Sequence, residues 1–134
     1  MNVFEIITPK ELTFYLYVDT NIKEALDIFE IHKYSVLPII DGEGSYITTI
    51  SEGDILRYIK NVCEFDYYKA KETKVIDIEK YRPYESLSQL GSFDDILDLI
   101  QSQNFIPIVD DRKKYIGIIR RKEILQYLKK YINK

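Results

Sequence analysis

Two stretches of the chain carry apolar residues at the spacing of an amphipathic helix. The first covers about residues 20–31, with Thr20 or Asp19 near its cap. In the second, Ser92 followed three residues later by Asp95 resembles a capping box, with Asp in place of the more usual Glu or Gln. Each stretch predicts one helix, because its apolar residues fall at i, i+3, i+4 and i+7. These residues are Ile22, Ala25, Leu26 and Phe29 in the first stretch, and Phe93, Ile96, Leu97 and Ile100 in the second.

A short apolar run follows each predicted helix. Residues 36–40 and 106–109 are too few for a helix and rich in β-branched side chains, so they predict buried strands. Polar turns at 41–45 and 110–114 lead to further apolar runs at 46–50 and 115–119, and each pair of runs predicts a β-hairpin. A helix closes each copy. We expect these helices to bury Ile55, Leu56 and Ile59 in the first copy and Ile124, Leu125 and Leu128 in the second.

The two copies form an internal repeat. When Pro38 is laid on Pro107, an offset of 69 residues, segment 38–59 aligns with 107–128 without a gap, and nine of the 22 positions are identical. Each copy is a strand, helix, strand, strand and helix that is too small to bury its apolar face alone. Two such units are expected to share a core by packing on each other.

Upstream of the helices the repeat is weaker. Residues 3–6 parallel residues 75–78, and both segments lead to a proline, Pro9 and Pro83. Residues 60–74 are the least patterned part of the chain. The predicted organisation is a first repeat at 1–62, a connection at 63–74 and a second repeat at 75–134.

Composition limits the classes of protein to consider. With 134 residues, of which 46% are apolar, the chain suits one compact fold unit. Its net charge of −3 comes from both signs spread along the sequence, so no basic stripe for nucleic acid is expected. No apolar run reaches the roughly 18 residues of a membrane span, and the start lacks a signal-peptide pattern. We therefore expect a cytoplasmic protein that binds neither nucleic acid nor membrane.

The sequence offers no catalytic set. His32 is the single histidine and lies near the end of the first predicted helix, where a surface role is expected. Cys63 is the single cysteine, which excludes an internal disulfide and a multi-cysteine zinc site. Gly42-Glu43-Gly44 precedes a strand, so it predicts a hairpin turn and not a phosphate-binding loop. We therefore expect a protein that is not an enzyme.

Each repeat has a buried run of the form apolar-Pro-apolar-apolar-Asp or close to it, followed by a hairpin. In the first repeat Ser51-Glu52-Gly53-Asp54 then opens the last helix. Together with the repeat, this opening resembles a tandem pair of cystathionine-β-synthase (CBS) domains, a Bateman module, of the stand-alone bacterial type. The resemblance implies an α+β fold of two βαββα repeats packed around a pseudo-twofold axis.

The resemblance also implies a ligand. In this family adenosine nucleotides occupy clefts between the repeats, the signature Asp holds ribose hydroxyls and the Ser or Thr meets phosphate. By this resemblance Asp54 would accept hydrogen bonds from a ribose and Ser51 would donate to a phosphate oxygen. The residues expected to border the base are Val36, Leu37 and Pro38, with Ser86 and Leu87 from the other repeat.

The residue chemistry fits this assignment and also fits a simpler one. A carboxylate offers two acceptor oxygens to adjacent hydroxyls, and a helix start offers free N–H groups to an anion. However, the spacing of Ser51 and Asp54 is equally that of a capping box for their own helix. The spacing alone does not choose between the two.

The second repeat departs from the family signature. Arg120 stands at the Ser/Thr position and Glu123 at the Asp position. Glutamate can still bind hydroxyls, and Arg120 can clamp a phosphate with two hydrogen bonds. The connection from helix to strand is also shorter, since Ala25 to Pro38 spans 13 positions and Ile96 to Pro107 spans 11. A degenerate second site, or Arg120 acting on a ligand held elsewhere, both remain open.

Two functions follow as expectations. The first is a regulatory sensor that binds AMP, ADP, ATP or a related adenosine compound, such as a cyclic dinucleotide or S-adenosylmethionine, and requires no cofactor. It would act as a homodimer on an unidentified effector protein. The second is a structural or protein-interaction module whose sites hold no nucleotide. The intact first signature favours the sensor, and the altered second signature favours the interaction module.

Overall fold

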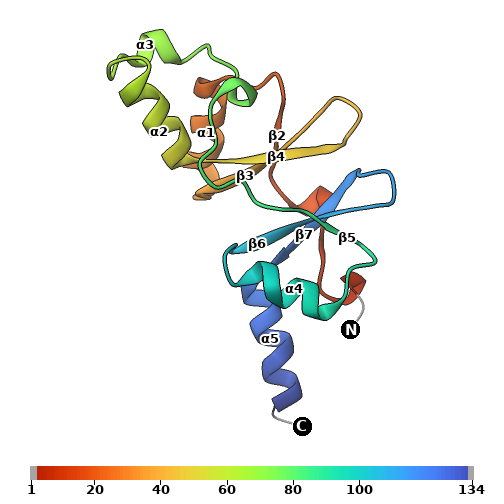
Figure 1. Ribbon diagram of the computed structural model, residues 1–134. Coiled ribbons are helices and arrows are strands. Elements are labelled where there is room, and N and C mark those ends of the chain that lie inside the picture. Colours follow the sequence, from red (N-terminus) through yellow and green to blue (C-terminus); the bar gives the residue numbers. More distant parts are fainter. Residues whose placement is uncertain (1–2, 133–134) are drawn as a thin grey trace. The chain divides into compact units, whose positions relative to one another are not determined.

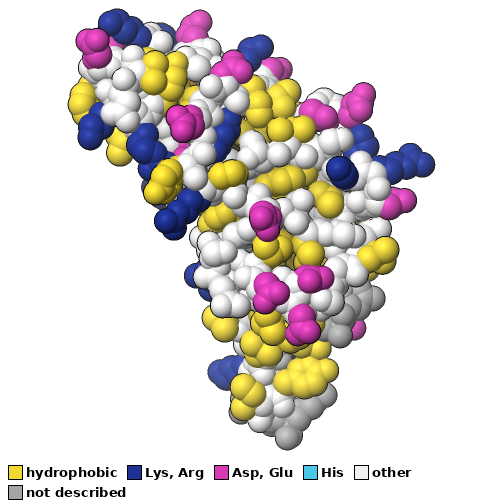
Figure 2. Space-filling view, viewed as in Figure 1, with side chains coloured by type: hydrophobic (Ala, Val, Ile, Leu, Met, Phe, Trp, Pro, Cys, Tyr) yellow, Lys and Arg dark blue, Asp and Glu magenta, His cyan; other side chains and the backbone are white. Residues whose placement is uncertain are grey.

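A computed structural model describes residues 3–132, and the chain forms two compact units (Figure 1). Among the described residues, unit 1 combines 3–13, 44–46 and 84–132, and unit 2 combines 14–43 and 47–83. Each unit therefore draws on segments that are far apart in the sequence. On the face seen in Figure 2, acidic and basic side chains are interspersed, as the mixed charge of the sequence leads one to expect.

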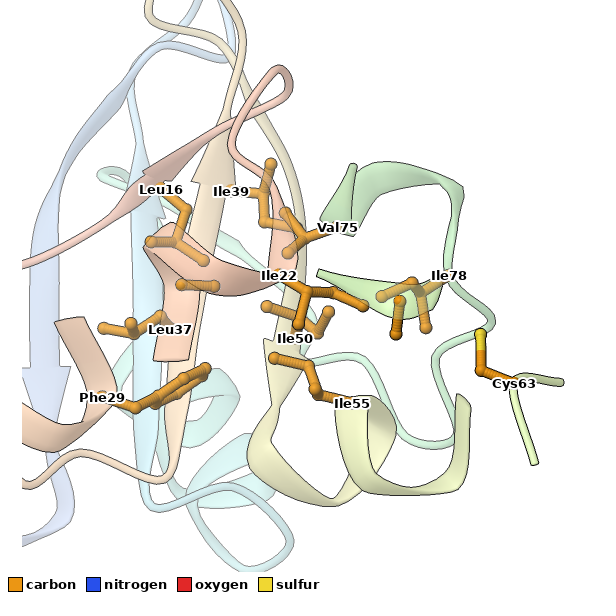
Figure 3. Close-up of a cluster of buried hydrophobic side chains, with 12 residues drawn as sticks. Leu16, Ile22, Phe29, Leu37, Ile39, Ile50, Ile55, Cys63, Val75 and Ile78 are labelled. Carbon is orange, nitrogen blue, oxygen red and sulfur yellow. The ribbon is translucent and has the colours of Figure 1, made fainter. Parts of the chain in front are cut away.

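Unit 2 holds the first βαββα repeat. Its elements are β2 (Leu16–Tyr17), α1 (Ile22–His32), β3 (Val36–Ile40), β4 (Tyr46–Ser51) and α2 (Glu52–Asn61), followed by the short α3 (Tyr67–Ala70). The sheet order is β2-β3-β4, with β2 parallel to β3. Its core contains Ile22, Ile39, Ile50 and Ile55 (Figure 3). The predicted hairpin is present, since β3 and β4 are hydrogen-bonded neighbours joined by a five-residue turn.

Unit 1 holds the second βαββα repeat. Its elements are β5 (Leu87–Ser88), α4 (Phe93–Ile100), β6 (Phe105–Val109), β7 (Tyr115–Arg120) and α5 (Arg121–Ile132), and β1 (Thr8–Pro9) adds a fourth strand. The sheet order is β1-β7-β6-β5, with β6 and β7 antiparallel and a bulge between Ile108 and Val109. Because Pro9 lies on an edge strand, its missing N–H is tolerated there. Pro38 and Pro107 are the third residues of β3 and β6, which confirms that they occupy equivalent strands.

The helix caps are partly as predicted. Ser92 and Asp95 form the predicted capping box at the start of α4. At α1 the prediction of Thr20 or Asp19 was wrong, because the cap is Asn21, whose side chain accepts from the Glu24 N–H while Glu24 accepts from the Asn21 N–H. The hydroxyl of Thr20 instead accepts a hydrogen bond from the Tyr17 N–H, within the turn before the helix.

The closing helices bury fewer residues than expected. Ile55 and Ile124 are buried, but Leu56 and Leu125 are 61% and 59% exposed, so the expectation that these leucines are buried was wrong. Consecutive residues of an α-helix point about 100° apart, so the leucine next to a fully buried isoleucine faces away from the core. Leu56 and Leu125 are themselves 69 residues apart, and the repeat therefore presents an exposed leucine at the same place twice.

The segments that precede the two repeats are exchanged between the units. The 3₁₀ turn Val3–Glu5 comes before the first repeat, yet Val3 is buried in the core of unit 1 beside residues of the second repeat. The 3₁₀ turn Val75–Asp77 comes before the second repeat, yet Val75 is buried in the core of unit 2 (Figure 3). The repeat boundaries drawn from the sequence stay a prediction, and the compact units follow a different division.

Candidate functional site

The start of α2 is built around a capping box. The Ser51 hydroxyl accepts from the Asp54 N–H at 3.0 Å, and the Asp54 carboxylate accepts from the Ser51 N–H through Oδ2 at 2.9 Å. The structural interpretation of this motif is therefore confirmed. Asp54 is nevertheless unusual for a surface helix, because its side chain is only 4% exposed and carries a charge.

The second oxygen of Asp54 joins the helix to another segment. Oδ1 accepts from Arg57 Nη2 at 2.6 Å, and it also accepts from the Tyr81 N–H at 3.0 Å. The guanidinium of Arg57 also lies over the Tyr81 ring, 4.9 Å from its centroid. Asp54 thus fixes the chain that leaves the Val75–Asp77 turn against the first turn of α2.

These side chains form one wall of a pocket in unit 2. The pocket has a volume of about 180 Å³. Its lining comes from α2 and the residue that follows it, and from the chain after the 3₁₀ turn: Asp54, Arg57, Tyr58, Asn61, Val62, Ile78, Glu79 and Tyr81. The volume is below the roughly 300 to 1,000 Å³ of sites that enclose whole small molecules. Such a pocket suits part of a nucleotide, for example its ribose and a phosphate.

Lys80 lies close to this site and is partly withdrawn from water. Its ammonium donates to the carbonyl oxygens of Val75 and Ile76, at 2.8 and 2.7 Å. Burial lowers the pKa of Lys80 from its ordinary value of 10.5, while the negative charges of Asp54 and Asp77 oppose that shift. The carboxylate of Asp54 therefore has a second cation nearby besides Arg57.

The corresponding position in unit 1 carries Glu123 on the first turn of α5. Its Oε1 accepts from Arg120 Nε at 2.9 Å, from the Arg120 N–H at 3.4 Å and from the Thr8 hydroxyl at 3.1 Å. Arg120 and Glu123, proposed from the sequence as a second ligand site, thus form an ion pair in this structure. The pair is partly exposed to water.

A second pocket lies beside Glu123, with a volume of about 350 Å³. It is lined by Glu5, Ile6, Glu123, Gln126, Tyr127 and Lys130. Four of these residues are 69 positions after a residue of the first pocket: Asp54 and Glu123, Arg57 and Gln126, Tyr58 and Tyr127, and Asn61 and Lys130. The two pockets are therefore equivalent in the repeat. The sequence signal for them is the repeat alignment continued along the closing helices to 61 and 130, which places these four pairs at equivalent positions.

The residues expected to border a base lie in both units. In β3, Val36 is half-buried, Pro38 is buried, and Leu37 packs into the hydrophobic core of unit 2, which leaves its backbone for any ligand contact. Ser86 is exposed, and Leu87 pairs with Ile108 in the sheet of unit 1. Their role in binding a base stays a prediction.

The single histidine and the single cysteine lie among packing residues. The His32 ring stacks on Phe14 with centroids 3.5 Å apart, and Cys63 is buried as a free thiol. Among residues 3–132, no three His, Cys, Asp or Glu side chains are grouped so that they could hold a metal ion. Within the same range, none of the helices has the length and apolar character needed to cross a bilayer.

Comparisons with known proteins agree on the family. A family model described as the CBS domain matches residues 3–61 and 82–130. An inosine-5′-monophosphate dehydrogenase from Methanocaldococcus jannaschii is 28% identical over 116 residues, which are 81% of this chain and 20% of that enzyme. The chain thus spans about a fifth of this curated relative and matches only its CBS part.

Solved structures share the fold. A structure of CbpB in complex with c-di-AMP has a TM-score of 0.87 at 21% identity, covering 99% of this chain and 87% of that one. A structure of CBSX2 in complex with AMP has a TM-score of 0.75 at 22% identity, covering 97% of each chain. At this level of identity the likeness establishes the α+β fold of tandem CBS repeats.

Proposed function

The chain belongs to the CBS domain family, and on that premise we propose that it is a regulatory module that binds an adenosine-containing nucleotide and catalyses no reaction. The ligand class is supported by two relatives of the same fold, whose structures hold c-di-AMP and AMP. In this proposal the nucleotide is a signal, and no further cofactor is needed.

One observation carries the proposal: a buried carboxylate forms the wall of a pocket at the start of a helix. Asp54 is held in place by the Ser51 N–H, so its orientation is fixed before any ligand arrives. A fixed acceptor costs less to bring to a ribose than a mobile one. In the proposed complex Asp54 accepts from ribose hydroxyls, and Ser51 and the first turn of α2 lie nearest a phosphate.

The remaining contacts are proposed with the first site. In the proposed complex the base is bordered by Val36, Leu37 and Pro38, together with Ser86 and Leu87. Leu37 would contact the base through its backbone. Arg120 and Glu123 form the second site, where a ligand must first open their ion pair. The first site is expected to bind more tightly, because it keeps the family signature at Ser51 and Asp54, whereas the second has Arg120 and Glu123 at these positions.

We further propose that the module acts as a homodimer on an effector protein. The closing helices α2 and α5 expose Leu56 and Leu125 at equivalent positions. A twofold dimer uses the same patch on both copies, and a patch that the repeat provides twice suits such an interface.

Titration calorimetry with AMP, ATP, cyclic di-AMP and S-adenosylmethionine tests the proposal. Asp54→Asn keeps the shape of the side chain and one carbonyl acceptor for the helix cap. It should weaken binding of the tightest of these compounds by about ten- to a hundredfold, since charge-assisted hydrogen bonds are lost. Glu123→Gln is the matched variant in the second repeat and should change that affinity less than Asp54→Asn does. Unchanged affinity in Asp54→Asn would contradict the ribose assignment.

A structural module without nucleotide is the alternative, and a specific observation favours it. Both signature carboxylates already have protein partners, Arg57 and Tyr81 for Asp54 and Arg120 and Thr8 for Glu123. A thermal-shift panel of the same compounds separates the two functions, because a ligand that binds only the folded state raises the unfolding midpoint. No shift at millimolar concentrations of any of them would favour the structural module.

A further inference from the structure

The hydrogen bonds of Asp54 leave little room for a ribose. A carboxylate has about four acceptor positions, two on each oxygen. The described residues fill three of them: Arg57 and the Tyr81 N–H on Oδ1, and the Ser51 N–H on Oδ2. A ribose presents two adjacent hydroxyl donors. Asp54 can therefore hold both hydroxyls only if one of its present donors leaves.

Arg57 is the donor that can leave most easily. The Ser51 and Tyr81 donors are backbone groups, fixed by the start of α2 and by the chain after the Val75–Asp77 turn. The Arg57 donor belongs to a flexible side chain that is 49% exposed, so water can solvate it when it moves. Asp54 would still have the ammonium of Lys80 nearby.

The released guanidinium stays at the same pocket. Arg57 lines it, and its side chain lies over the Tyr81 ring. A neutral ligand breaks the Arg57–Asp54 ion pair and gives Arg57 no new anion. A ligand with a phosphate next to its ribose replaces the carboxylate with another anion, to which a guanidinium can donate two parallel hydrogen bonds.

From this geometry we propose that Arg57 is a specificity-determining residue that makes binding at Asp54 depend on the charge of the ligand. Arg57 stays bound to the Asp54 carboxylate when the ligand is a neutral nucleoside. It leaves the carboxylate when the ligand carries a phosphate. The inference rests on the proposed nucleotide-binding function and adds to it the rule by which the first site selects its ligand.

The second repeat lacks this arrangement. The residue equivalent to Arg57 is Gln126, and the cation at the second pocket is Lys130, one helical turn further along α5. The ion partner of Glu123 is Arg120, which precedes it and lies outside the second pocket. Selection by ligand charge through displacement of a pocket arginine is therefore a property of the first site.

The test compares the affinities of adenosine and AMP by titration calorimetry for the full chain and its variants. The wild type should bind AMP at least about tenfold more tightly than adenosine. In Arg57→Gln this ratio should fall to about threefold or less, because adenosine binds more tightly than to the wild type and AMP loses its partner. Arg57→Lys keeps the charge without the planar fork and should give an intermediate ratio.

Lys60→Gln is the matched control. Lys60 is an exposed cation on the same helix and does not line the pocket, so its loss changes the net charge equally and should leave the ratio within about twofold of wild type. An unchanged ratio in Arg57→Gln, or a wild-type ratio near one, overturns the inference and leaves nucleotide binding intact. Failure of both the wild type and Arg57→Gln to bind AMP or adenosine overturns the inference, and failure to bind ATP, cyclic di-AMP and S-adenosylmethionine as well overturns the proposed function with it.

Discussion

The two units hold their exchanged segments by different means. In unit 1 the segment after Val3 continues into β1, which pairs with β7, with Thr8 opposite Ile118 and Pro9 opposite Gly117. In unit 2 the backbone bonds lie at the valine and before it, where the Val75 N–H donates to the Thr20 carbonyl oxygen and Lys74 forms an isolated antiparallel bridge with Asn21. The chain after Val75 is held at Tyr81, whose N–H donates to the Asp54 carboxylate. The chain that follows the buried valine is thus held by a strand pair in unit 1 and by the Asp54 carboxylate in unit 2.

This difference decides which unit can respond to a ligand. A strand pair has no group that a nucleotide would compete for. The bond between Asp54 and the Tyr81 N–H shares its carboxylate with the proposed ribose site. In unit 1 the Thr8 hydroxyl also reaches Glu123, but β1 stays paired without it. Ligand binding at Asp54, which displaces Arg57 and keeps the Tyr81 N–H, is therefore expected to affect the surroundings of the exchanged segment in unit 2 more than those in unit 1.

The largest expected effect tests the strand pair. β1 approaches β7 at Gly117, where a Cβ atom would collide with the Thr8 carbonyl oxygen and the backbone has a φ of +155°. Gly117→Ala should lower the free energy of unfolding by about 2 to 4 kcal/mol, since backbone must move to admit the methyl group. Urea unfolding measures it.

The equivalent residue in unit 2 provides the control for Gly117→Ala. Thr48 lies in β4, at the edge of its three-stranded sheet. Thr48→Ala should cost about 1 kcal/mol or less, because no close backbone contact is changed. Equal losses in the two variants would contradict the claim that only unit 1 depends on close approach at this position.

The next prediction tests the hydrogen bonds and the ion pair of Asp54 in unit 2. Asp54→Ala removes the capping bond to Ser51, the ion pair with Arg57 and the bond to Tyr81, and should cost about 2 to 3 kcal/mol of stability. Glu123→Ala removes a partly exposed ion pair and should cost about 1 kcal/mol or less. Urea unfolding of both variants without ligand measures the difference, and a larger loss in Glu123→Ala would reverse the comparison.

The repeat was predictable from the sequence because its signals are local. Helical spacing around Ile22 and Ile96, and the matched prolines in short apolar runs, are set by neighbouring residues. These signals gave the βαββα order of both units and the strands β3 and β6. The cap of α1 was missed because Thr20 and Asn21 are adjacent and both are good capping residues.

The exchange of segments was not predictable, because it depends on contacts across many residues. Val3 and Val75 look alike in sequence, and nothing near them indicates that each is buried with the other repeat. The partners of Asp54 were half predictable. The spacing of Ser51 and Asp54 predicted the capping box, whereas the bond from the Tyr81 N–H spans 27 positions and depends on the exchange of segments between the units.

A smaller effect on stability is expected at the positions where the units are alike. Leu56→Ser and Leu125→Ser alter exposed side chains and should each change the free energy of unfolding by about 0.5 kcal/mol or less. If the closing helices form the proposed homodimer, the double variant should weaken self-association by about tenfold or more in sedimentation equilibrium. Leu90→Ser, at an exposed leucine outside the helices, is the control, and a dimer unaffected by the double variant would place the interface elsewhere.

The smallest effect concerns the titration of Lys80 in unit 2. Burial lowers its pKa in the folded state below 10.5, so over the pH range between the two values the unfolded chain binds more protons. Stability contributed at Lys80 should therefore rise as the pH increases through that range. Asp54→Asn removes a negative charge that raises this pKa, so the pKa of Lys80 should fall further, while Glu123→Gln should leave it unchanged.

An NMR titration of the Lys80 side chain in the wild type, Asp54→Asn and Glu123→Gln measures these shifts directly. A pKa that rises in Asp54→Asn would show that Asp54 does not act on Lys80 through its charge, and would weaken the account of a carboxylate that keeps a second cation when Arg57 leaves.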